Sequence, residues 1–211
     1  KLEDYPNLNT INIFIEEFVI NKDFDRVYRV QYDNNDIAVW ALVYYAIRLN
    51  CLKDLKDFLD EYNGNMVEEL GQFGHIVGQI LRGDYSVGPG TASSAGEDVF
   101  KNALYMLLNP SSNELPEDFL VESVDDFIWF SLFRSLLSSN RAGKLQDLHE
   151  KIKELKETRD GNFSLIEIAK YQLLCLMLPE FLDTLVESDE YSIDGRHLAF
   201  IFVETGILSH K

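Results

Sequence analysis

Four histidines are the first residues of this chain that could do chemistry, because imidazole binds metals and transfers protons near neutral pH. They lie far apart in the sequence, at His75, His149, His197 and His210. None belongs to a pair with a cysteine or a carboxylate at metal-ligand spacing. Lone histidines of this kind are usually exposed or hydrogen-bonded side chains. We therefore expect no metal site and assign no residue as a metal ligand.

Doublets of the same acidic residue could in principle act as acid and base, and we consider Glu16-Glu17, Glu68-Glu69 and Asp125-Asp126. Adjacent residues on a helix point to different sides, so the two carboxylates of a pair cannot act together on one proton. We expect these carboxylates to lie on solvated surfaces instead. Ser131 and Ser135 lack a glycine elbow, so neither is expected to be a nucleophile.

The stretch Gly88–Gly96 has the composition of a loop that cradles phosphate ahead of a helix. It lacks the lysine of a Walker motif, follows a helical pattern instead of a strand, and leads into Glu97-Asp98, which would repel phosphate. We predict no nucleotide site, no cofactor and no catalytic residue, and hence no enzyme. The remaining enzyme hypothesis is an all-α enzyme using the loop 83–96, which a stabilising small ligand would support.

The two cysteines, Cys51 and Cys175, both lie in helical apolar runs, and Cys175 stands within Leu-Leu-Cys-Leu-Met, an inert setting. Free buried thiols are favoured over a disulfide, and a reducing compartment follows. No apolar run approaches the ~20 residues that span a bilayer, and no secretory leader is seen. Because the chain begins at Lys1 and ends at Lys211 after an apolar run, we expect a piece of a longer protein.

Charge excludes a class of partner. The 211 residues include 36 acidic and 19 basic side chains, a formal net charge of −17. Nucleic-acid binding needs local positive potential, so direct nucleic-acid contact is not expected. Hydrophobic residues make up 46% of the chain, enough for a globular core.

The element around which the chain is organised is the nearly uncharged segment Asp36–Asn50, which is predicted to be a buried helix. Asn35 or Asp36 could cap its beginning, and Asn50 could close its last turn in a left-handed conformation. Further helices are expected at Leu8–Ile20, Cys51–Tyr62, Met66–Leu81, Glu97–Leu108, Val124–Leu137, Gly143–Arg159 and Phe163–Leu178, and after Pro179 and Ser192. A short piece, Asp23–Gln31, precedes the central segment, and Gly143–Arg159 is expected to carry only a narrow apolar stripe. The residues expected to face inward in the last two helices are Leu182, Leu185, Val186, Leu198, Ala199, Ile201, Phe202 and Ile207. No convincing strand pair is seen.

Two details bear on packing. Gly71, Gly74 and Gly78 lie three and four residues apart within one helix, a spacing that indicates close helix–helix contact. The aromatic residues at helical spacing could line a peptide groove, but core packing is their ordinary role. They are Trp40, Tyr44, Tyr45, Trp129 and Phe130.

These patterns predict an all-α fold of about nine or ten helices, in which apolar and more polar helices alternate as stacked antiparallel hairpins. No strict 34-residue signature recurs, so an irregular α-solenoid is favoured over tetratricopeptide repeats. We expect residues 1–211 to form a single solenoid segment from the middle of a longer chain. Irregular loops are expected near 83–96 and 111–122.

Three blocks of the sequence resemble the nucleoporin-interacting-component family, the helical scaffold nucleoporins of the inner ring of the nuclear pore. The blocks are Trp40–Arg48, Asp98–Leu108 followed by Val124–Leu132, and Arg196–Val203. Their order and spacing also fit the family. Asn50 departs from the pattern, since a glycine is expected shortly after the arginine.

The resemblance implies a non-enzymatic structural role at the nuclear pore complex in the nuclear envelope. A scaffold of this kind would bind other nucleoporins, both scaffold and linker subunits, and contribute to pore assembly and nucleocytoplasmic transport. No small-molecule substrate is implied. The alternative from another class is a helical adaptor or cargo-binding module of a vesicle-coat or trafficking complex.

Overall fold

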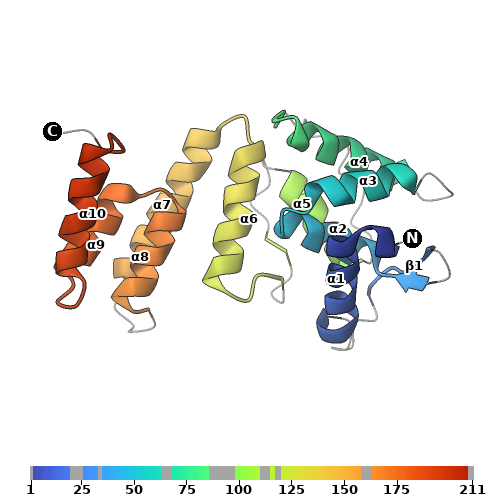
Figure 1. The fold of residues 1–211 in the computed structure, drawn as a ribbon, viewed down its shortest axis with the longest axis horizontal. Coiled ribbons are helices and arrows are strands. Elements are labelled where there is room, and N and C mark those ends of the chain that lie inside the picture. Colours follow the sequence, from blue (N-terminus) through green and yellow to red (C-terminus); the bar gives the residue numbers. More distant parts are fainter. Residues whose placement is uncertain are drawn as a thin grey trace. The chain divides into compact units, whose positions relative to one another are not determined.

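The computed structural model of the chain describes residues 2–19, 26–32, 35–62, 68–85, 98–109, 115–116, 120–157 and 163–208 (Figure 1). Within these residues the fold is mostly helical, with ten α-helices that pack largely as neighbours in sequence, as the all-α prediction requires. The chain divides into two compact units, Lys1–Ser139 and Asn140–Lys211. In the described part of the chain, no helix combines the length and apolarity needed to cross a bilayer.

The first unit begins with a short 3-10 turn, Leu2–Asp4, and α1, Pro6–Phe14, which continues as a π-helical turn over Ile15–Val19. Pro6 stands at the start of α1, where its missing N–H removes no helical hydrogen bond. The buried side of α1 carries Leu8 and Ile11 and packs against α2 and α3.

A two-stranded antiparallel hairpin, β1 (Val30–Tyr32) and β2 (Asn35–Ile37), corrects the expectation that the chain has no strand pair. Val30 lies opposite Ile37, and both side chains are buried. Strands of three residues are too short to show an alternating pattern, so no local pattern marks them. The predicted short piece Asp23–Gln31 is irregular over residues 26–29 and then becomes β1, and residues 23–25 lie outside the described part.

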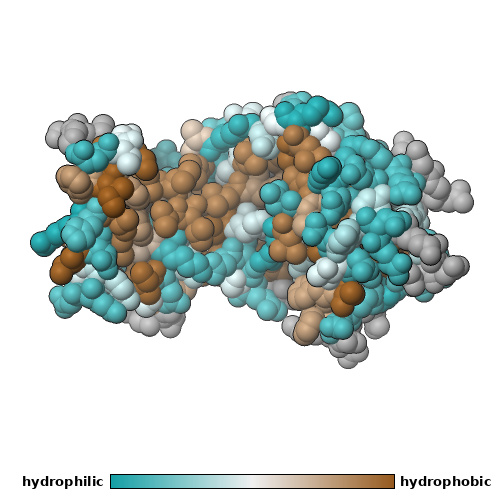
Figure 2. Space-filling model, viewed as in Figure 1, coloured by the Kyte–Doolittle hydropathy of each residue, from teal (hydrophilic) through white to brown (hydrophobic). Residues whose placement is uncertain are grey.

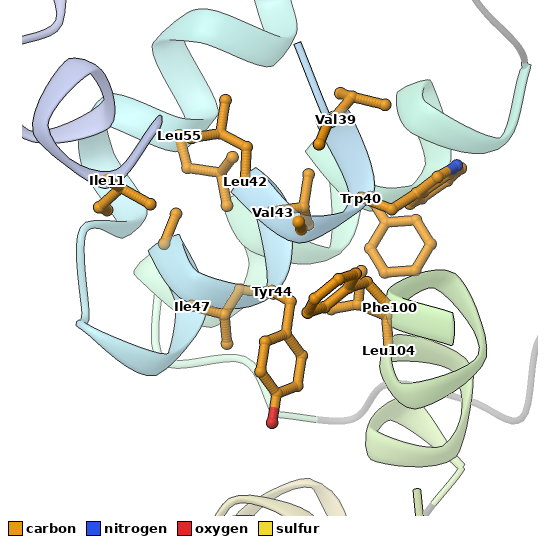
Figure 3. Close-up of a cluster of buried hydrophobic side chains, with 14 of the residues drawn as sticks. Ile11, Val39, Trp40, Leu42, Val43, Tyr44, Ile47, Leu55, Phe100 and Leu104 are labelled. Atoms are coloured by element: carbon orange, nitrogen blue, oxygen red, sulfur yellow. The ribbon is translucent and has the colours of Figure 1, made fainter. Parts of the chain in front are cut away.

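The central helix α2 spans Val39–Arg48, three residues shorter at its beginning than the predicted segment Asp36–Asn50, because Asn35–Ile37 belong to β2. The residue before its first turn is Ala38, without a side-chain cap, so the predicted Asn35 or Asp36 cap is wrong. Its burial on several sides is confirmed. The core around it draws residues from α1, α3 and α5, and the hydroxyl of Tyr44 points away from the cluster (Figure 3).

The helices α3 (Leu52–Glu61) and α4 (Glu68–Leu81) pack on each other. Two of the three α4 glycines lie where α3 approaches closely. A Cβ atom at Gly74 would lie 3.4 Å from Leu59 Cβ, and one at Gly78 would lie 2.9 Å from Lys56 Cε. A Cβ atom at Gly71 would meet nothing within 4 Å. The predicted close contact therefore holds for Gly74 and Gly78 and fails for Gly71.

The unit is completed by α5 (Val99–Leu108), which packs against α2, and α6 (Val124–Leu137), which packs against α5. Asp98 caps α5 by accepting hydrogen bonds from Phe100 N and Lys101 N, both at 2.9 Å. The same carboxylate accepts one from Tyr28 N at 2.6 Å, so it also ties the segment before β1 to α5. Burial raises the pKa of Asp98 above its ordinary value despite these donors.

The second unit contains α7 (Arg141–Glu157), α8 (Leu165–Leu174), α9 (Leu178–Glu187) and α10 (Ser192–Glu204). Each packs on the next along the chain. Its inner cluster joins residues of the last three helices and the turns beside them, namely Ala169, Phe181, Leu182, Leu185, Tyr191, Leu198, Ala199, Phe202 and Leu208. The helix α7 has the predicted narrow stripe, with Leu148 and Ile152 buried.

Two predictions for this unit need correction. The predicted helix Phe163–Leu178 stops at Leu174, because Leu176 adopts a left-handed conformation (φ 60°) and α9 begins at Leu178. Three residues expected to face inward are exposed, namely Val186 (38%), Ile201 (48%) and Ile207 (54%).

The short turns that join α2 to α3 and α8 to α9 share one geometry. Asn50 (φ 57°) and Leu176 (φ 60°) take the left-handed position, and the next residue, Cys51 or Met177, donates to a carbonyl five positions back. This is the Schellman ending of a helix. The predicted role of Asn50 is confirmed. Because asparagine tolerates this conformation, the same turn can form with asparagine in place of the expected glycine.

Candidate functional site

The three histidines that the structure describes lie on different helices. His75 and His197 are exposed on α4 and α10, and His210 lies outside the described residues. His149 Nε2 lies 2.8 Å from the carbonyl oxygen of Cys175, so this nitrogen donates its proton to the backbone. In the described part of the chain, no three histidine, cysteine or acidic side chains gather as a metal site would require.

The two thiols and the two serines are likewise structural. Cys51 and Cys175 are both free, as predicted, but only Cys175 is buried, and its burial raises the pKa of the thiol to about 11. A thiol with that pKa carries very little thiolate at neutral pH and is a poor nucleophile. Ser135 Oγ donates to the carbonyl oxygen of Ser131 at 2.7 Å, a bond within α6. The glycine-rich stretch 88–96 lies outside the described residues.

One acidic pair differs from the prediction of a solvated surface. Asp126 forms an ion pair with Arg48, and its side chain is only 16% exposed. The same carboxylate accepts from Ser123 N at 3.0 Å, while Ser123 Oγ accepts from Asp126 N, which closes the capping box of α6. Asp125 is exposed, Glu16 pairs with Arg29 at 2.7 Å, and the side chains of Glu68-Glu69 lie outside the described residues.

The pKa values of the pair follow from this geometry. Burial alone would raise the pKa of Asp126, but hydrogen bonds from Arg48 and Ser123 outweigh it and hold the pKa below its ordinary value. Burial opposes the charged form of Arg48, yet the carboxylate raises its pKa further. The guanidinium also lies 5.3 Å from the centroid of the Trp129 ring. Both groups are therefore charged over the whole neutral range, and this cluster stabilises the fold without transferring protons.

Most of the aromatic residues that could have lined a peptide groove are core residues. Trp40, Tyr44 and Phe130 are at most 3% exposed. Tyr45 and Trp129 are half-buried and packed against the same core. Their rings contact one another in edge-to-face and tilted pairs, for example Tyr44 with Trp129 at 5.8 Å. The prediction of core packing is confirmed for Trp40, Tyr44 and Phe130.

The surface feature that the sequence did not identify is an apolar ridge along α8, which we define as Ile166, Leu173, Leu174 and Leu176. These side chains are 45%, 43%, 47% and 69% exposed. The first two lie seven positions apart, and therefore on one face of the helix. Figure 2 shows hydrophobic surface over the α8–α10 unit. The apolar residues of α8 lie on all sides of the helix, so the sequence does not indicate which of them are covered, and only the structure identifies this ridge.

The backbone beneath the ridge supports its identification. Leucine seldom adopts positive φ, and the left-handed conformation costs roughly 1–2 kcal/mol for a residue with a Cβ atom. Leu176 adopts it, and among the described residues its side chain is the most exposed of the large apolar ones. The Schellman ending of α8 imposes this conformation, and it turns the Leu176 side chain into solvent beside the ridge residues of α8.

Comparison of the chain with protein-family models, with curated proteins and with solved structures finds no match. Function is therefore argued below from the residues and their geometry.

Proposed function

We propose that this chain is a non-enzymatic scaffold segment, built as an irregular α-solenoid of stacked antiparallel helical hairpins, that works by binding other proteins. The observation that carries this proposal is the apolar ridge of α8. Exposed apolar residues that gather on one face are typical of protein-binding surfaces, whereas singly scattered ones are not. Lys170 is exposed on the same face, four positions from both Ile166 and Leu174, and Glu167 is exposed beside Ile166.

The ridge suits another helix better than an extended peptide. Ile166, Leu173 and Leu174 repeat at helical spacing and form a raised row, which fits the groove between side chains of a second helix. Main-chain binding to an extended peptide would need an unpaired strand edge, and α8 offers none. The partner is therefore a helical protein with an apolar face, as in a scaffold of stacked helices.

The nuclear pore is the setting that the three sequence blocks favour. Two of the blocks, Trp40–Arg48 and Asp98–Leu108 with Val124–Leu132, contact each other directly in the fold. Arg48 pairs with Asp126, and the Tyr44 ring lies 5.8 Å from both Phe100 and Trp129. Residues that define the resemblance thus hold one core together. We accordingly propose a place in the inner ring of the nuclear pore complex, with other nucleoporins as partners.

Live-cell imaging of the fluorescently tagged full-length protein tests this setting. A punctate nuclear rim is the expected result. Cytoplasmic vesicles would overturn the nuclear-pore assignment and support the trafficking adaptor instead.

The role of the ridge is tested separately with the double variant Ile166→Ser/Leu173→Ser in the full-length protein. Its expected effect is a faster exchange of the tagged protein at the rim, measured by recovery after photobleaching, because partner contacts are lost. Ile13→Ser is the matched control, since Ile13 is similarly exposed (49%) but lies on α1. Equal recovery of the ridge variant and the control would refute the ridge as a binding surface, whatever the location of the protein.

A further inference from the structure

Among the residues that the structure describes, helix α10 is covered on one side only. Its inner side contributes Leu198, Ala199 and Phe202 to the cluster of the second unit. On the opposite side Ile193 and Phe200 are each 67% exposed. Phenylalanine at the middle of an exposed helix face is unusual for a surface that stays in water.

The charges on this outer side are arranged symmetrically about Phe200. Arg196 precedes Phe200 by four positions, Glu204 follows it by four, and both are exposed. Residues four apart lie on the same face of a helix, so the three side chains form one row. The row reads positive, aromatic, negative from its beginning to its end.

Such a row is complementary to its own reverse. When two copies of α10 lie antiparallel about a two-fold axis at Phe200, the two Phe200 rings meet at the centre. Arg196 then faces the partner's Glu204, and Glu204 faces the partner's Arg196. A two-fold interface requires this kind of self-complementarity, in which residue i meets residue j and j meets i.

The placement of these charges is not explained by α10 alone. Glu204 is the last residue of the helix, where the helix dipole disfavours a negative charge. Among the residues that the structure describes, neither Arg196 nor Glu204 has an ion-pair partner within the chain. A second copy would supply both partners.

We propose that two copies of this chain associate through α10 in an antiparallel pair centred on Phe200. The contact is separate from the α8 ridge and does not depend on the proposed function. One helix pair buries less than the roughly 800 Å² per partner of a standard interface. The association is therefore weak, with a dissociation constant on the order of 100 μM.

Charge reversal tests the pairing, using sedimentation equilibrium of the 211-residue chain over a concentration series. Arg196→Glu brings two like charges together at each end, and so does Glu204→Arg, so each single variant should dimerise roughly tenfold more weakly. The double variant Arg196→Glu/Glu204→Arg restores both pairs and should return to within about threefold of the original constant. An equimolar mixture of the two single variants should form heterodimers, because each supplies the charges that the other lacks.

Misfolding cannot imitate this pattern. Arg196→Glu moves negative charge toward the beginning of α10 and Glu204→Arg places positive charge at its end, both of which the helix dipole favours. Circular dichroism should show unchanged helix content. Phe200→Ser should abolish the dimer, whereas Ile166→Ser on α8 should leave it unchanged. A chain that stays monomeric up to ~1 mM, well above the expected constant, or a dimer that charge reversal does not weaken and restore, would overturn the proposal.

Discussion

Arg48, the last residue of α2, and Asp126, in the first turn of α6, form an ion pair across 78 positions of the chain. The guanidinium also lies over Trp129, one turn further along α6. A single side chain therefore links the C-terminal end of the central helix to both the cap and the aromatic face of a distant helix.

A double-mutant cycle measures this link. Arg48→Met and Asp126→Asn should each destabilise the chain, and their coupling free energy should be about 1–2 kcal/mol, since the pair is partly buried and hydrogen-bonded. Urea unfolding of the two single variants and the double variant provides the measurement. The exposed pair Lys156–Glu187 is the control, with a coupling of about 0.5 kcal/mol or less. Equal coupling in both cycles would contradict a special role for Arg48–Asp126.

Acid should remove the stabilisation by the Arg48–Asp126 pair within a pH range that the pKa shift of Asp126 predicts. The pKa of Asp126 is lower in the folded chain than in the unfolded chain, so the unfolded state takes up the proton first as the pH falls. The stabilisation by the pair is complete above about pH 5 and is lost as the pH drops through the folded pKa. The stability difference between the original chain and Asp126→Asn should therefore be constant from about pH 5 to 8 and shrink below about pH 4. A stability difference between the original chain and Asp126→Asn that grows on acidification would show that folding raises, and does not lower, the pKa of Asp126.

Trp40→Ala should destabilise the chain by about 3–5 kcal/mol, because the ring is buried and its removal leaves a cavity. The ring is 3% exposed, and its centroid lies 5.4 Å from that of Phe73. Denaturant unfolding is the measurement. Phe18→Ala serves as the control, because Phe18 is 61% exposed and its loss should change stability by less than about 1 kcal/mol. A loss below about 1 kcal/mol at Trp40 would indicate an exposed ring that is available to a partner.

Glycine-to-alanine substitution should have opposite effects at two helical positions. A Cβ atom at Gly195 would lie 2.8 Å from Leu185 Cβ and 3.1 Å from Val186 N, so Gly195→Ala must push α10 away from α9. Net destabilisation of about 1–2 kcal/mol is expected after the better helix propensity of alanine is included. Gly71→Ala meets open space and should stabilise by about 0.5–1 kcal/mol. Thermal unfolding of both variants measures the two effects. Stabilisation by Gly195→Ala would show that α9 and α10 are further apart than in this structure.

The two left-handed turns should also respond differently to glycine. Leu176→Gly relieves the strain of a leucine at positive φ and removes little packing, so it should stabilise the chain by about 0.5–1 kcal/mol. Asn50→Gly should change stability by less than about 0.5 kcal/mol, because asparagine already tolerates the conformation. Chemical unfolding compares them. A destabilising Leu176→Gly would mean that the leucine side chain contributes packing that its exposure does not suggest.

The sequence located helices best where local signals bound them on both sides. Val124–Leu137 has its predicted limits, because Ser123 forms a capping box at its start and the apolar run ends at Ser138. The start of α2 was misplaced, because the pairing of β2 with β1 is set by another strand and not by a local cap. The end of α8 was misplaced as well, since neither glycine nor proline marks Leu176.

The sequence by itself determined that the chain is helical and that Trp40 and its neighbours are buried. These properties follow from hydrogen bonds, caps and apolar spacing within a few positions of each residue. Only the tertiary structure decided which faces of α8 and α10 are left exposed and which cation meets Asp126. Those outcomes depend on how helices distant in sequence pack together, and an apolar helix carries no local mark of the side that its neighbours will cover.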